Sequence, residues 1–302
     1  MRWAYEQVDF EPGGKDHSSE GGSFDTAKEI VRKVYDFHPP EFLHYDFVRI
    51  KGKGGKISSS SGDVLTLEDL LEVYEPEIIR HFFVSMRPNV EFAIDLSDEV
   101  IKNYDVYDRL ERQYYGEEPI KAGKEKFSQR VYEMCQVGEV SDTMAYQPSF
   151  RHLTSIVQIY AFDLAKIVNF YQNKGYLKSE FDRKKLEMRS EKAINWIKKY
   201  ANETFCFSLH KSPLDFSKIP VDYRKGLVEL KKLTILEKKQ DNSDEKAFFD
   251  QIYQLIKKEN LDNVEFFKSV YQCLIGKDSG PRIASFLSVL DVEVLELLLP
   301  DQ

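Results

Sequence analysis

Residues 51–62 combine the groups that bind phosphate. The stretch reads Lys51-Gly52-Lys53-Gly54-Gly55-Lys56-Ile57-Ser58-Ser59-Ser60-Ser61-Gly62. Glycines permit close approach of the backbone to a ligand, serine hydroxyls and backbone N–H groups donate to phosphate oxygens, and lysine ammonium groups add positive charge. A helix N-terminus, expected near Thr66, also favours an anion. The pattern therefore indicates a mobile loop that binds a polyphosphate.

The same stretch, taken alone, is equally typical of a flexible and soluble surface loop. It is not a Walker A loop, because the pattern G-x-x-x-x-G-K-[ST] is absent. The choice between the two interpretations depends on the elements that surround the loop.

Length and composition set the broad class of the protein. A chain of 302 residues can form one large domain or two ordinary ones. Its 42% hydrophobic and 31% charged residues are typical of a soluble globular protein. A net charge of −8 excludes a uniformly basic nucleic-acid-binding coat. It leaves room for a local basic face, since phosphate contacts need only a local cluster of Lys and Arg.

The cysteines and apolar runs predict a cytoplasmic protein without a metal site. Cys135, Cys206 and Cys273 are far apart and show no C-x-x-C spacing, so neither a zinc site nor a disulfide framework is expected. No apolar run is long enough to span a bilayer, and the N-terminus resembles neither a signal nor a transit peptide.

The part of the chain before residue 95 predicts an α/β segment, because short β-type runs alternate with short helices and glycine-rich turns. The first expected elements are a strand end or extended segment from Trp3 to Phe10 and a loop from Glu11 to Gly22. A helix capped by Asp25 should then stop at His38-Pro39-Pro40, and a strand should follow from Tyr45 to Ile50. Two more helices are expected, one opened by a Thr66 and Asp69 capping box and one whose first residue is Pro76.

The rest of the chain has a helical period almost throughout, so the fold as a whole is expected to be mainly α. The expected helices are a stripe from Val100 to Leu110 that ends near Gly116, a long apolar face from Leu153 to Tyr171, and helices over residues 180–201, 221–238, 244–258, 263–275, 281–289 and 291–298. Asp262 with Glu265 should begin one of these helices, and Gly276 should end it.

The loop and the segments before it resemble class I aminoacyl-tRNA synthetases of the lysyl type. Lys56-Ile57-Ser58-Ser59-Ser60 resembles the class I signature Lys-Met-Ser-Lys-Ser. The resemblance is dense over residues 1–116 and thinner afterwards. It includes Met1-Arg2-Trp3-Ala4-Tyr5, Val8-Asp9-Phe10-Glu11-Pro12, Gly14-Lys15-Asp16-His17, Gly21-Gly22-Ser23, Asp25-Thr26, Asp69-Leu70-Leu71-Glu72-Val73-Tyr74, Pro76-Glu77, Arg87-Pro88-Asn89 and Gly280-Pro281-Arg282.

The resemblance implies a role for particular residues. Lys56, Ser58, Ser59 and Ser60 would hold the ATP phosphates while lysine attacks the α-phosphate, which is stabilisation by positioned donors rather than covalent catalysis. Gly14, Asp16 and His17 would lie at the ATP site. Trp3, Tyr5 and His17 would form the pocket for the substrate lysine, where an aromatic face attracts the ammonium group. The implied cofactor is ATP with Mg²⁺. The structural alternatives are a core anchor for Trp3 and an Asx turn beside a surface histidine for Asp16 and His17.

Two departures from the family pattern matter. Ser59 stands where the second lysine of the signature is usual, so Lys56, Lys53 and Lys51 all remain candidates for the contact with pyrophosphate. The other class I signature, His-x-Gly-His, is absent. The chain is therefore expected to be a C-terminal fragment that lacks the first half of the catalytic domain and does not activate lysine by itself.

The resemblance also implies two functional regions and a set of partners. Residues 1–95 would be the second half of a Rossmann-type catalytic domain, and residues 96–302 a helical domain that binds the anticodon of tRNA-Lys. Basic residues recur along two of the expected helices, where they could meet phosphates or simply be solvated. The alternative functions are a glutamyl-type class I synthetase, against which Trp3 and the Gly14-Lys15-Asp16-His17 block argue, and a noncatalytic RNA-binding module derived from a synthetase.

Overall fold

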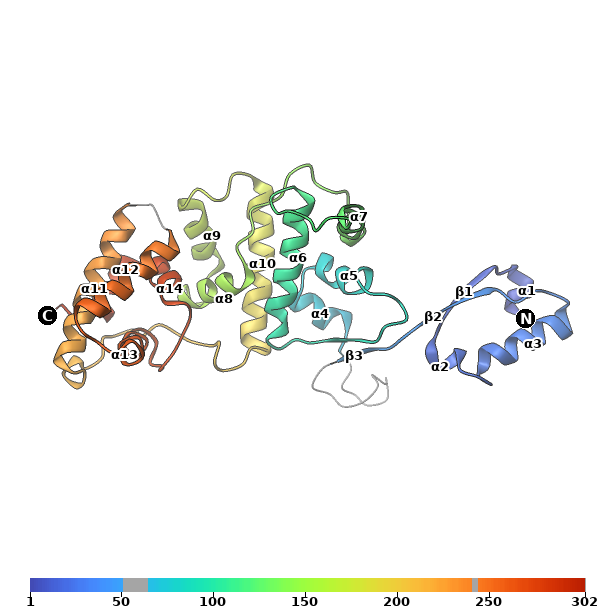
Figure 1. Ribbon diagram of the computed structural model, residues 1–302, viewed down its shortest axis with the longest axis horizontal. Helices are drawn as coiled ribbons and strands as arrows, with labels where there is room; N and C mark the ends of the chain where they lie inside the picture. Colours follow the sequence, from blue (N-terminus) through green and yellow to red (C-terminus); the bar gives the residue numbers. More distant parts are fainter. Residues whose placement is uncertain (51–64, 241–243, 302) are drawn as a thin grey trace. The chain divides into compact units, whose positions relative to one another are not determined.

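The computed structural model describes residues 1–50, 65–240 and 244–301 (Figure 1). Two compact units divide the chain, residues 1–144 and residues 145–302. The architecture is mainly helical with two small parallel sheets, which confirms the predicted fold class. The functional boundary expected after residue 95 stays a prediction, because the division between the compact units falls after Met144.

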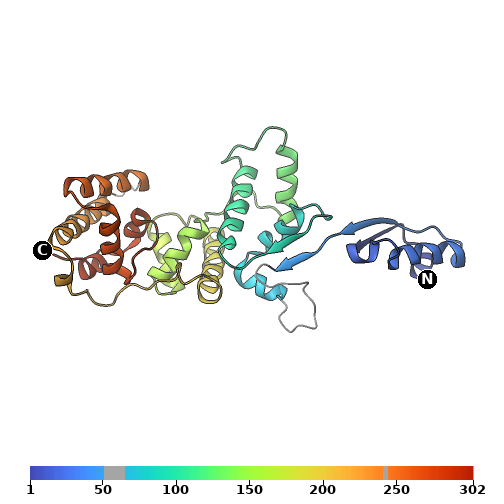
Figure 2. The same cartoon turned by 60° about the horizontal axis from the view of Figure 1, so that its bottom comes forward.

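The first unit contains the strands and the shorter helices. Its elements are α1 (Arg2–Glu6), β1 (Phe10–Gly14), α2 (Lys15–Ser18), α3 (Ser23–Tyr35), β2 (Glu41–Tyr45), β3 (Val48–Ile50), α4 (Leu67–Val73), α5 (Pro76–Val84), β4 (Phe92–Ile94), α6 (Glu99–Tyr114) and α7 (Glu125–Cys135). Strand β1 pairs with β2 in parallel from Phe10↔Glu41 to Gly14↔Tyr45, and β3 pairs with β4 in parallel from Val48↔Phe92 to Ile50↔Ile94. Figure 2 shows β1 and β2 running beside α3.

The prediction of a loop over residues 11–22 is wrong, because this stretch contains most of β1 and all of α2. Glu41 donates its N–H to the carbonyl of Asp9, so alternate residues of β1 face β2 and Pro12 faces the open side of the ladder. A proline is tolerated there, since no ladder hydrogen bond needs its missing N–H. Gly13 suits the strand because an added Cβ would lie 2.6 Å from the ring of Phe42.

Three other boundaries also differ from the predictions. Residues 2–6 form helix α1 rather than an extended segment, because its one turn packs Trp3 edge-on against Phe24. The helix predicted to be capped by Asp25 begins earlier, at Ser23, and Asp25 instead accepts a hydrogen bond from the N–H of Gly21. The predicted strand over residues 45–50 is interrupted, since residues 46 and 47 join β2 to β3.

The local signals around residues 66–76 are confirmed. Thr66 and Asp69 form a reciprocal capping box at the start of α4, and Pro76 is the first residue of α5. Buried tyrosines then join α4 to the elements that follow. The hydroxyl of Tyr104 in α6 donates to the carbonyl of Val73 at 2.9 Å. The hydroxyl of Tyr74 donates to the carbonyl of Asp95, just after β4, at 2.7 Å, and accepts from Asn103 of α6 at 3.0 Å. These buried hydrogen bonds fix α4 against α6.

The second unit is built from helices. They are α8 (Phe150–Ile159), α9 (Leu164–Asn173), α10 (Glu180–Lys199), the 3₁₀ turn η1 (Phe216–Lys218), α11 (Val221–Gln240), α12 (Glu245–Lys258), α13 (Asn263–Ile275), α14 (Ile283–Val289) and α15 (Val292–Leu298) (Figure 1). Helices α11 to α15 enclose an apolar core that includes Leu227, Phe248, Phe266 and Phe286. Among the described helices, none is long and apolar enough to cross a membrane.

The single long apolar face expected from Leu153 to Tyr171 is divided between two helices. The break is forced by Ala161 and Phe162, whose φ angles are +51° and +65°, and Asp163 then caps α9. The helix predicted over residues 263–275 has the expected ends, since Asp262 accepts from the backbone of Val264 and Glu265. Gly276, at its other end, has a φ of +69°.

Candidate functional site

A hollow of 490 Å³ lies within the N-terminal part of the first unit. Elements α1, β1, α2, α3 and β2 contribute its walls. Trp3, Gly14 and His17, three of the residues predicted to form a site, line it together. The other lining residues include Glu11, Gly13, Ser23, Phe24, Phe42 and Tyr45. The structure therefore brings together residues from five different elements.

Aromatic rings form one wall of this hollow. The Trp3 and Phe24 rings meet edge to face at 5.2 Å, and the Phe24 and Phe42 rings lie 3.9 Å apart. Glu11 lies beside them, where a hydrogen bond from Arg2 and another from Trp3 lower the pKa of its carboxyl group. A face of aromatic rings next to a carboxylate can hold an aliphatic stem that ends in a positive charge.

Two of the predicted residues do not line the hollow. Tyr5 is 87% exposed on α1, and Asp16 is exposed in α2. His17, the residue after Asp16, lies with its Nδ1 atom 3.2 Å from the Ser23 hydroxyl. This contact joins α2 to the start of α3 and turns the imidazole toward the hollow wall. The assignment of Tyr5 and Asp16 to ligand contacts stays a prediction.

Gly22 lies next to Ser23, a residue of the hollow, and its lack of a side chain is required by the turn before α3. A Cβ at this position would lie 2.7 Å from the carbonyl oxygen of Ser19 and 2.8 Å from that of His17. Both are backbone atoms, so a larger residue would displace the turn that carries His17. The Gly21-Gly22 pair was the signal. Gly14, by contrast, leaves ordinary contact distance for a Cβ, at 3.6 Å from Tyr45.

The predicted phosphate-binding loop lies outside the described residues. Lys56, Ser58, Ser59 and Ser60 all fall in the undescribed range 51–64. Its two flanks are described: β3 ends at Ile50, and the capping box of α4 begins at Thr66. In the described ranges, no group of three or more His, Cys, Asp or Glu side chains is arranged to hold a metal ion.

A second and larger cavity, of 710 Å³, lies within the helical unit. Its walls come from α8, α9, α11, α12, α14 and the segments between them. A volume of this size is typical of ligand-binding pockets, which measure about 300–1,000 Å³. Its charged and aromatic lining includes Tyr146, Arg151, His152, Lys174, Tyr176, Glu237, Lys238, Glu245, Lys277 and Arg282.

The cavity offers stacking surfaces together with positive charge. The rings of Tyr146 and Tyr176 stack at 4.7 Å with an interplanar angle of 4°. The hydroxyl of Tyr171, a residue 1% exposed, has no hydrogen-bond partner within the described residues. Burial and the nearby charge of Lys174 lower the pKa of Lys238 to about 8, although its ammonium group donates to the carbonyl of Ser288. An anionic ligand with a planar ring would complement these groups.

Several cations of the helical unit are structural rather than free to meet a ligand. Arg189 is fully buried and donates to the carbonyl of Pro148, and Lys231 donates to the carbonyl of Leu299 and to Asp301. Lys184 and Lys225 are exposed. Some of the basic residues that recur along the two helices therefore make hydrogen bonds inside the protein. The cavity, by contrast, gathers cations that the sequence pattern did not predict to lie together.

The stability of the helical unit should fall in mild acid because of His152. Its Nδ1 atom lies 3.1 Å from the Ser285 hydroxyl, and burial lowers the pKa of the imidazole. The unfolded chain therefore binds a proton at this site more readily than the folded chain. The contribution is fully present above the unfolded pKa, about 6.5, and is lost as the pH falls.

We expect urea unfolding curves at pH 7.5 and pH 5 to show this loss. A His152→Gln variant should show a smaller difference between the two pH values than the unmodified chain. The matched control is His38→Gln at an exposed position. An unchanged pH dependence in the His152 variant, or an equal change in the control, would contradict the assignment.

Comparison with known proteins shows the class of protein to which the N-terminal unit belongs. Residues 1–138, which contain the first hollow and the predicted phosphate-binding loop, match the family model of class I tRNA synthetases, type K. The match covers the elements from α1 to α7. The N-terminal unit is thus that of a class I tRNA synthetase.

The similarity to individual proteins extends over almost the whole chain. The chain is 43% identical over 296 residues to a lysine–tRNA ligase of Borreliella burgdorferi, which covers 98% of this chain and 56% of that relative. It is 38% identical over 303 residues to one of Treponema pallidum, covering 99% of this chain and 56% of the relative. It is 39% identical over 297 residues to one of Thermococcus kodakarensis, covering 97% of this chain and 56% of the relative. The chain belongs to the class I lysyl-tRNA synthetase family, and spans about half the length of the curated relatives it matches.

Proposed function

We propose that this chain is part of a lysine–tRNA ligase, which uses ATP to attach lysine to tRNA-Lys through a lysyl-adenylate. The observation that carries the proposal is the similarity of almost the whole chain to lysine–tRNA ligases. It is supported by the hollow that unites Trp3, Gly14 and His17. The ligase acts in protein synthesis, so we also place it in the cytoplasm.

In this proposal, the first hollow receives lysine and part of ATP. The aromatic wall of Trp3 and Phe24 contacts the lysine stem, and Glu11, which also forms an ion pair with Arg2, contributes negative charge near its ammonium group. Gly14, Asp16 and His17 contact the nucleotide, with Tyr5 and His17 at the edge of the amino-acid pocket. ATP supplies the activated phosphate to which the lysine carboxylate is joined, and Mg²⁺ would accompany its phosphates. Lys56, Ser58, Ser59 and Ser60 donate to these phosphates.

Exposed apolar residues in the first unit suggest that the ladder of β1 and β2 packs against a further segment. Tyr5, Phe10, Val34 and Tyr45 have 87%, 56%, 68% and 49% of their surface exposed. A two-stranded ladder of this kind is marginally stable by itself. Phe10 and Tyr45 are exposed on the ladder, and Tyr5 and Val34 on α1 and α3, and such exposed apolar groups favour association. We propose that the ladder of β1 and β2 is completed by strands from the part of the relatives' length that this chain does not match.

The helical unit is proposed to bind tRNA-Lys, with the 710 Å³ cavity receiving a nucleotide. Unpaired RNA bases are recognised by stacking on aromatic rings and by contacts to their edges. The Tyr146 and Tyr176 stack supplies such rings, and Arg151 and Arg282, which line the same cavity, would meet the phosphates. The unpartnered hydroxyl of Tyr171 supplies a polar group for a base edge.

Binding of the chain to tRNA-Lys tests this proposal directly. We expect tight binding that weakens as salt rises, because phosphate contacts release counterions. A transcript with an altered anticodon should bind about tenfold more weakly or worse, since one wrong base costs about 1–3 kcal/mol in a specific site. Equal affinity for the two transcripts, or no binding to either, would contradict the proposed role of the helical unit.

A further inference from the structure

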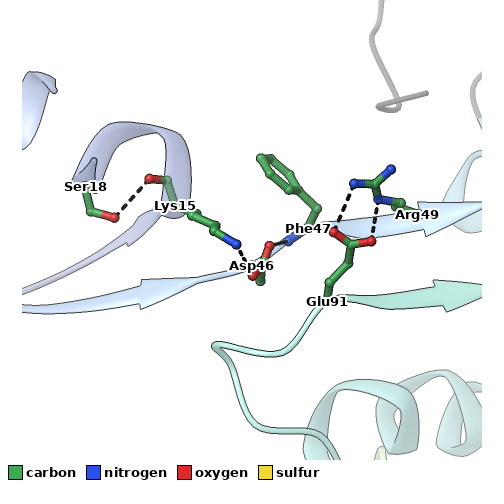
Figure 3. Close-up of polar contacts among 6 residues, drawn as sticks. All are labelled: Lys15, Ser18, Asp46, Phe47, Arg49 and Glu91. Carbon is green, nitrogen blue, oxygen red and sulfur yellow. Dashed lines mark hydrogen bonds and ion pairs between the residues drawn. The ribbon is translucent and has the colours of Figure 1, made fainter. Parts of the chain in front are cut away.

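An ion pair joins α2 to the short connection between the two parallel ladders of the first unit. This connection, residues 46 and 47, is called the joint below. The first ladder ends at the pair Gly14↔Tyr45, and the second begins at Val48↔Phe92. Only residues 46 and 47 lie between β2 and β3. Lys15 and Asp46 are the next residues after Gly14 and Tyr45, so their side chains meet one step beyond the end of the first ladder. Figure 3 shows this arrangement.

Asp46 is held from three directions. Its Oδ2 atom accepts from the Lys15 ammonium group at 2.9 Å, and its Oδ1 atom accepts from the N–H of Phe47 at 2.8 Å. Its own N–H donates to the carbonyl of Pro88 at 2.9 Å, before β4. The Asp46 side chain is only 9% exposed, although that of Lys15 is 60% exposed. The hydrogen bond between them lowers the pKa of Asp46 and raises that of Lys15, so both groups stay charged near neutral pH.

A second ion pair continues across the next ladder. Arg49 in β3 reaches Glu91 with its Nε atom at 2.6 Å and its Nη2 atom at 3.0 Å, a bidentate contact (Figure 3). The negative charge of Glu91 also contributes to the raised pKa of Lys15. Charged contacts thus tie α2 to the joint and tie β3 to the segment before β4. Strand β3 ends at Ile50, immediately before residues 51–64.

We propose that Lys15 and Asp46 form a positioning pair, which holds α2, with Asp16 and His17, in a fixed relation to the joint that leads through β3 to the predicted phosphate-binding loop. The proposal rests on the proposed function. Helix α2 has four residues, and the Ser18 hydroxyl donates to the Lys15 carbonyl within it at 3.1 Å. The contact of His17 with Ser23 ties α2 to α3, and the Lys15–Asp46 pair ties it to the end of β2. A helix this short depends on contacts to other elements for its orientation.

The competing interpretation is that Lys15 contacts a ligand phosphate directly. The two interpretations differ in what Asp46 does. A positioning pair requires both partners, so removal of either should have the same effect, and removal of both should be no worse. A direct ligand contact requires Lys15 alone, and its loss should raise the KM for ATP rather than lower kcat.

The test uses the longest protein that the gene encodes and measures lysine-dependent ATP–pyrophosphate exchange. Asp46→Asn keeps the acceptor for Phe47 and removes the charge, and Lys15→Met keeps the aliphatic stem. We expect each to lower kcat about tenfold, because misplacement of a site residue by about 1 Å can cost up to about a hundredfold. The KM for ATP should change less than about threefold, and the double variant should match the worse single variant. Lys15→Arg should stay within about threefold of the unmodified protein.

The matched control is the exposed pair of Lys33 and Glu29 on α3, whose ion pair measures 3.0 Å. The Lys33→Met and Glu29→Gln double variant should exchange at the unmodified rate. An Asp46→Asn variant with unchanged kcat, singles whose effects multiply in the double variant, or a Lys15→Met effect confined to the KM for ATP would each overturn the positioning pair.

Hydrogen exchange separates failure of the pair from failure of the proposed function. We expect the backbone amides of residues 15–18 to exchange faster in Asp46→Asn than in the unmodified protein, with residues 26–34 of α3 unchanged. Unchanged exchange in residues 15–18 would overturn the pair even if the enzyme is active. If the unmodified protein shows no lysine-dependent turnover, the proposed function fails, and the pair is then decided by the amide exchange alone.

Discussion

Replacement of Lys56 by alanine is expected to lower the rate of lysine activation by about a hundredfold to a thousandfold in the complete enzyme. That is the usual cost of removing one positioned donor from the charge that develops in a transition state. Lys56 stands at the first position of the segment that resembles the class I signature. The KM for lysine should change little, because the proposed function places the Lys56 ammonium group at the phosphates rather than at the amino acid. Pyrophosphate exchange at saturating lysine measures the effect.

The neighbouring lysines provide the controls for this prediction. Lys51→Ala and Lys53→Ala remove the same charge from the same loop, and Ser59 stands where a second lysine is usual. We expect one of these two variants to lose activity, but less than Lys56→Ala does. The lysine removed in that variant would be the second cation at the pyrophosphate. If Lys56→Ala stays within about threefold of the unmodified enzyme, the assignment of Lys56 is wrong.

Removal of two arginines from the helical cavity should weaken tRNA binding by about ten- to a hundredfold. Arg151 lies on α8 and Arg282 at the start of α14, and both line the cavity. In the Arg151→Ala and Arg282→Ala double variant, the slope of log affinity against log salt should fall by about 1.5 to 2, because the two proposed phosphate contacts would be lost. Filter binding of the chain to tRNA-Lys at several salt concentrations measures both quantities.

The control for the cavity prediction removes two exposed cations from helix faces. The Lys184→Ala and Lys225→Ala double variant changes the net charge by the same amount, and both residues are exposed. We expect it to keep its affinity within about threefold. A larger loss in this control than in the cavity variant would show that the helix faces, rather than the cavity, carry the RNA contacts.

The sequence predicted the elements whose ends are set by local chemistry. The capping box of Thr66 and Asp69, Pro76 at the start of α5, and the Asp262 and Gly276 ends of α13 all occur as expected. Each depends on contacts within a few residues, so the sequence alone contains the information. The long amphipathic helices of the second unit were predicted for the same reason, since their apolar faces repeat with the helical period.

The failures occur where a distant contact overrides the local preference. Strand β1 contains Pro12, Gly13 and Gly14, and therefore has the composition of a loop. It is a strand because β2 pairs with it in parallel and because the Phe42 ring occupies the space above Gly13. Helix α7 (Glu125–Cys135) was not predicted at all. The hydroxyl of its buried Tyr132 donates to the carboxylate of Glu111, which lies on α6.

The candidate sites show the same division. Trp3, Gly14 and His17 were selected through a family resemblance, and the structure brings them to one hollow. Phe24 and Phe42 complete that wall, but no motif singles them out. The Lys15 and Asp46 pair and the helical cavity join residues that are far apart in the sequence. Such sites become visible only when packing places distant side chains together.

Lysine-dependent ATP–pyrophosphate exchange is the measurement that tests the central claim most directly. The complete protein should exchange pyrophosphate with lysine and not with glutamate, and the 302-residue chain alone should show no exchange. That result would establish a lysine–tRNA ligase whose activity needs more than this chain. Exchange with glutamate instead of lysine would contradict the assigned substrate, and no exchange by the complete protein with either amino acid would contradict the assigned enzyme.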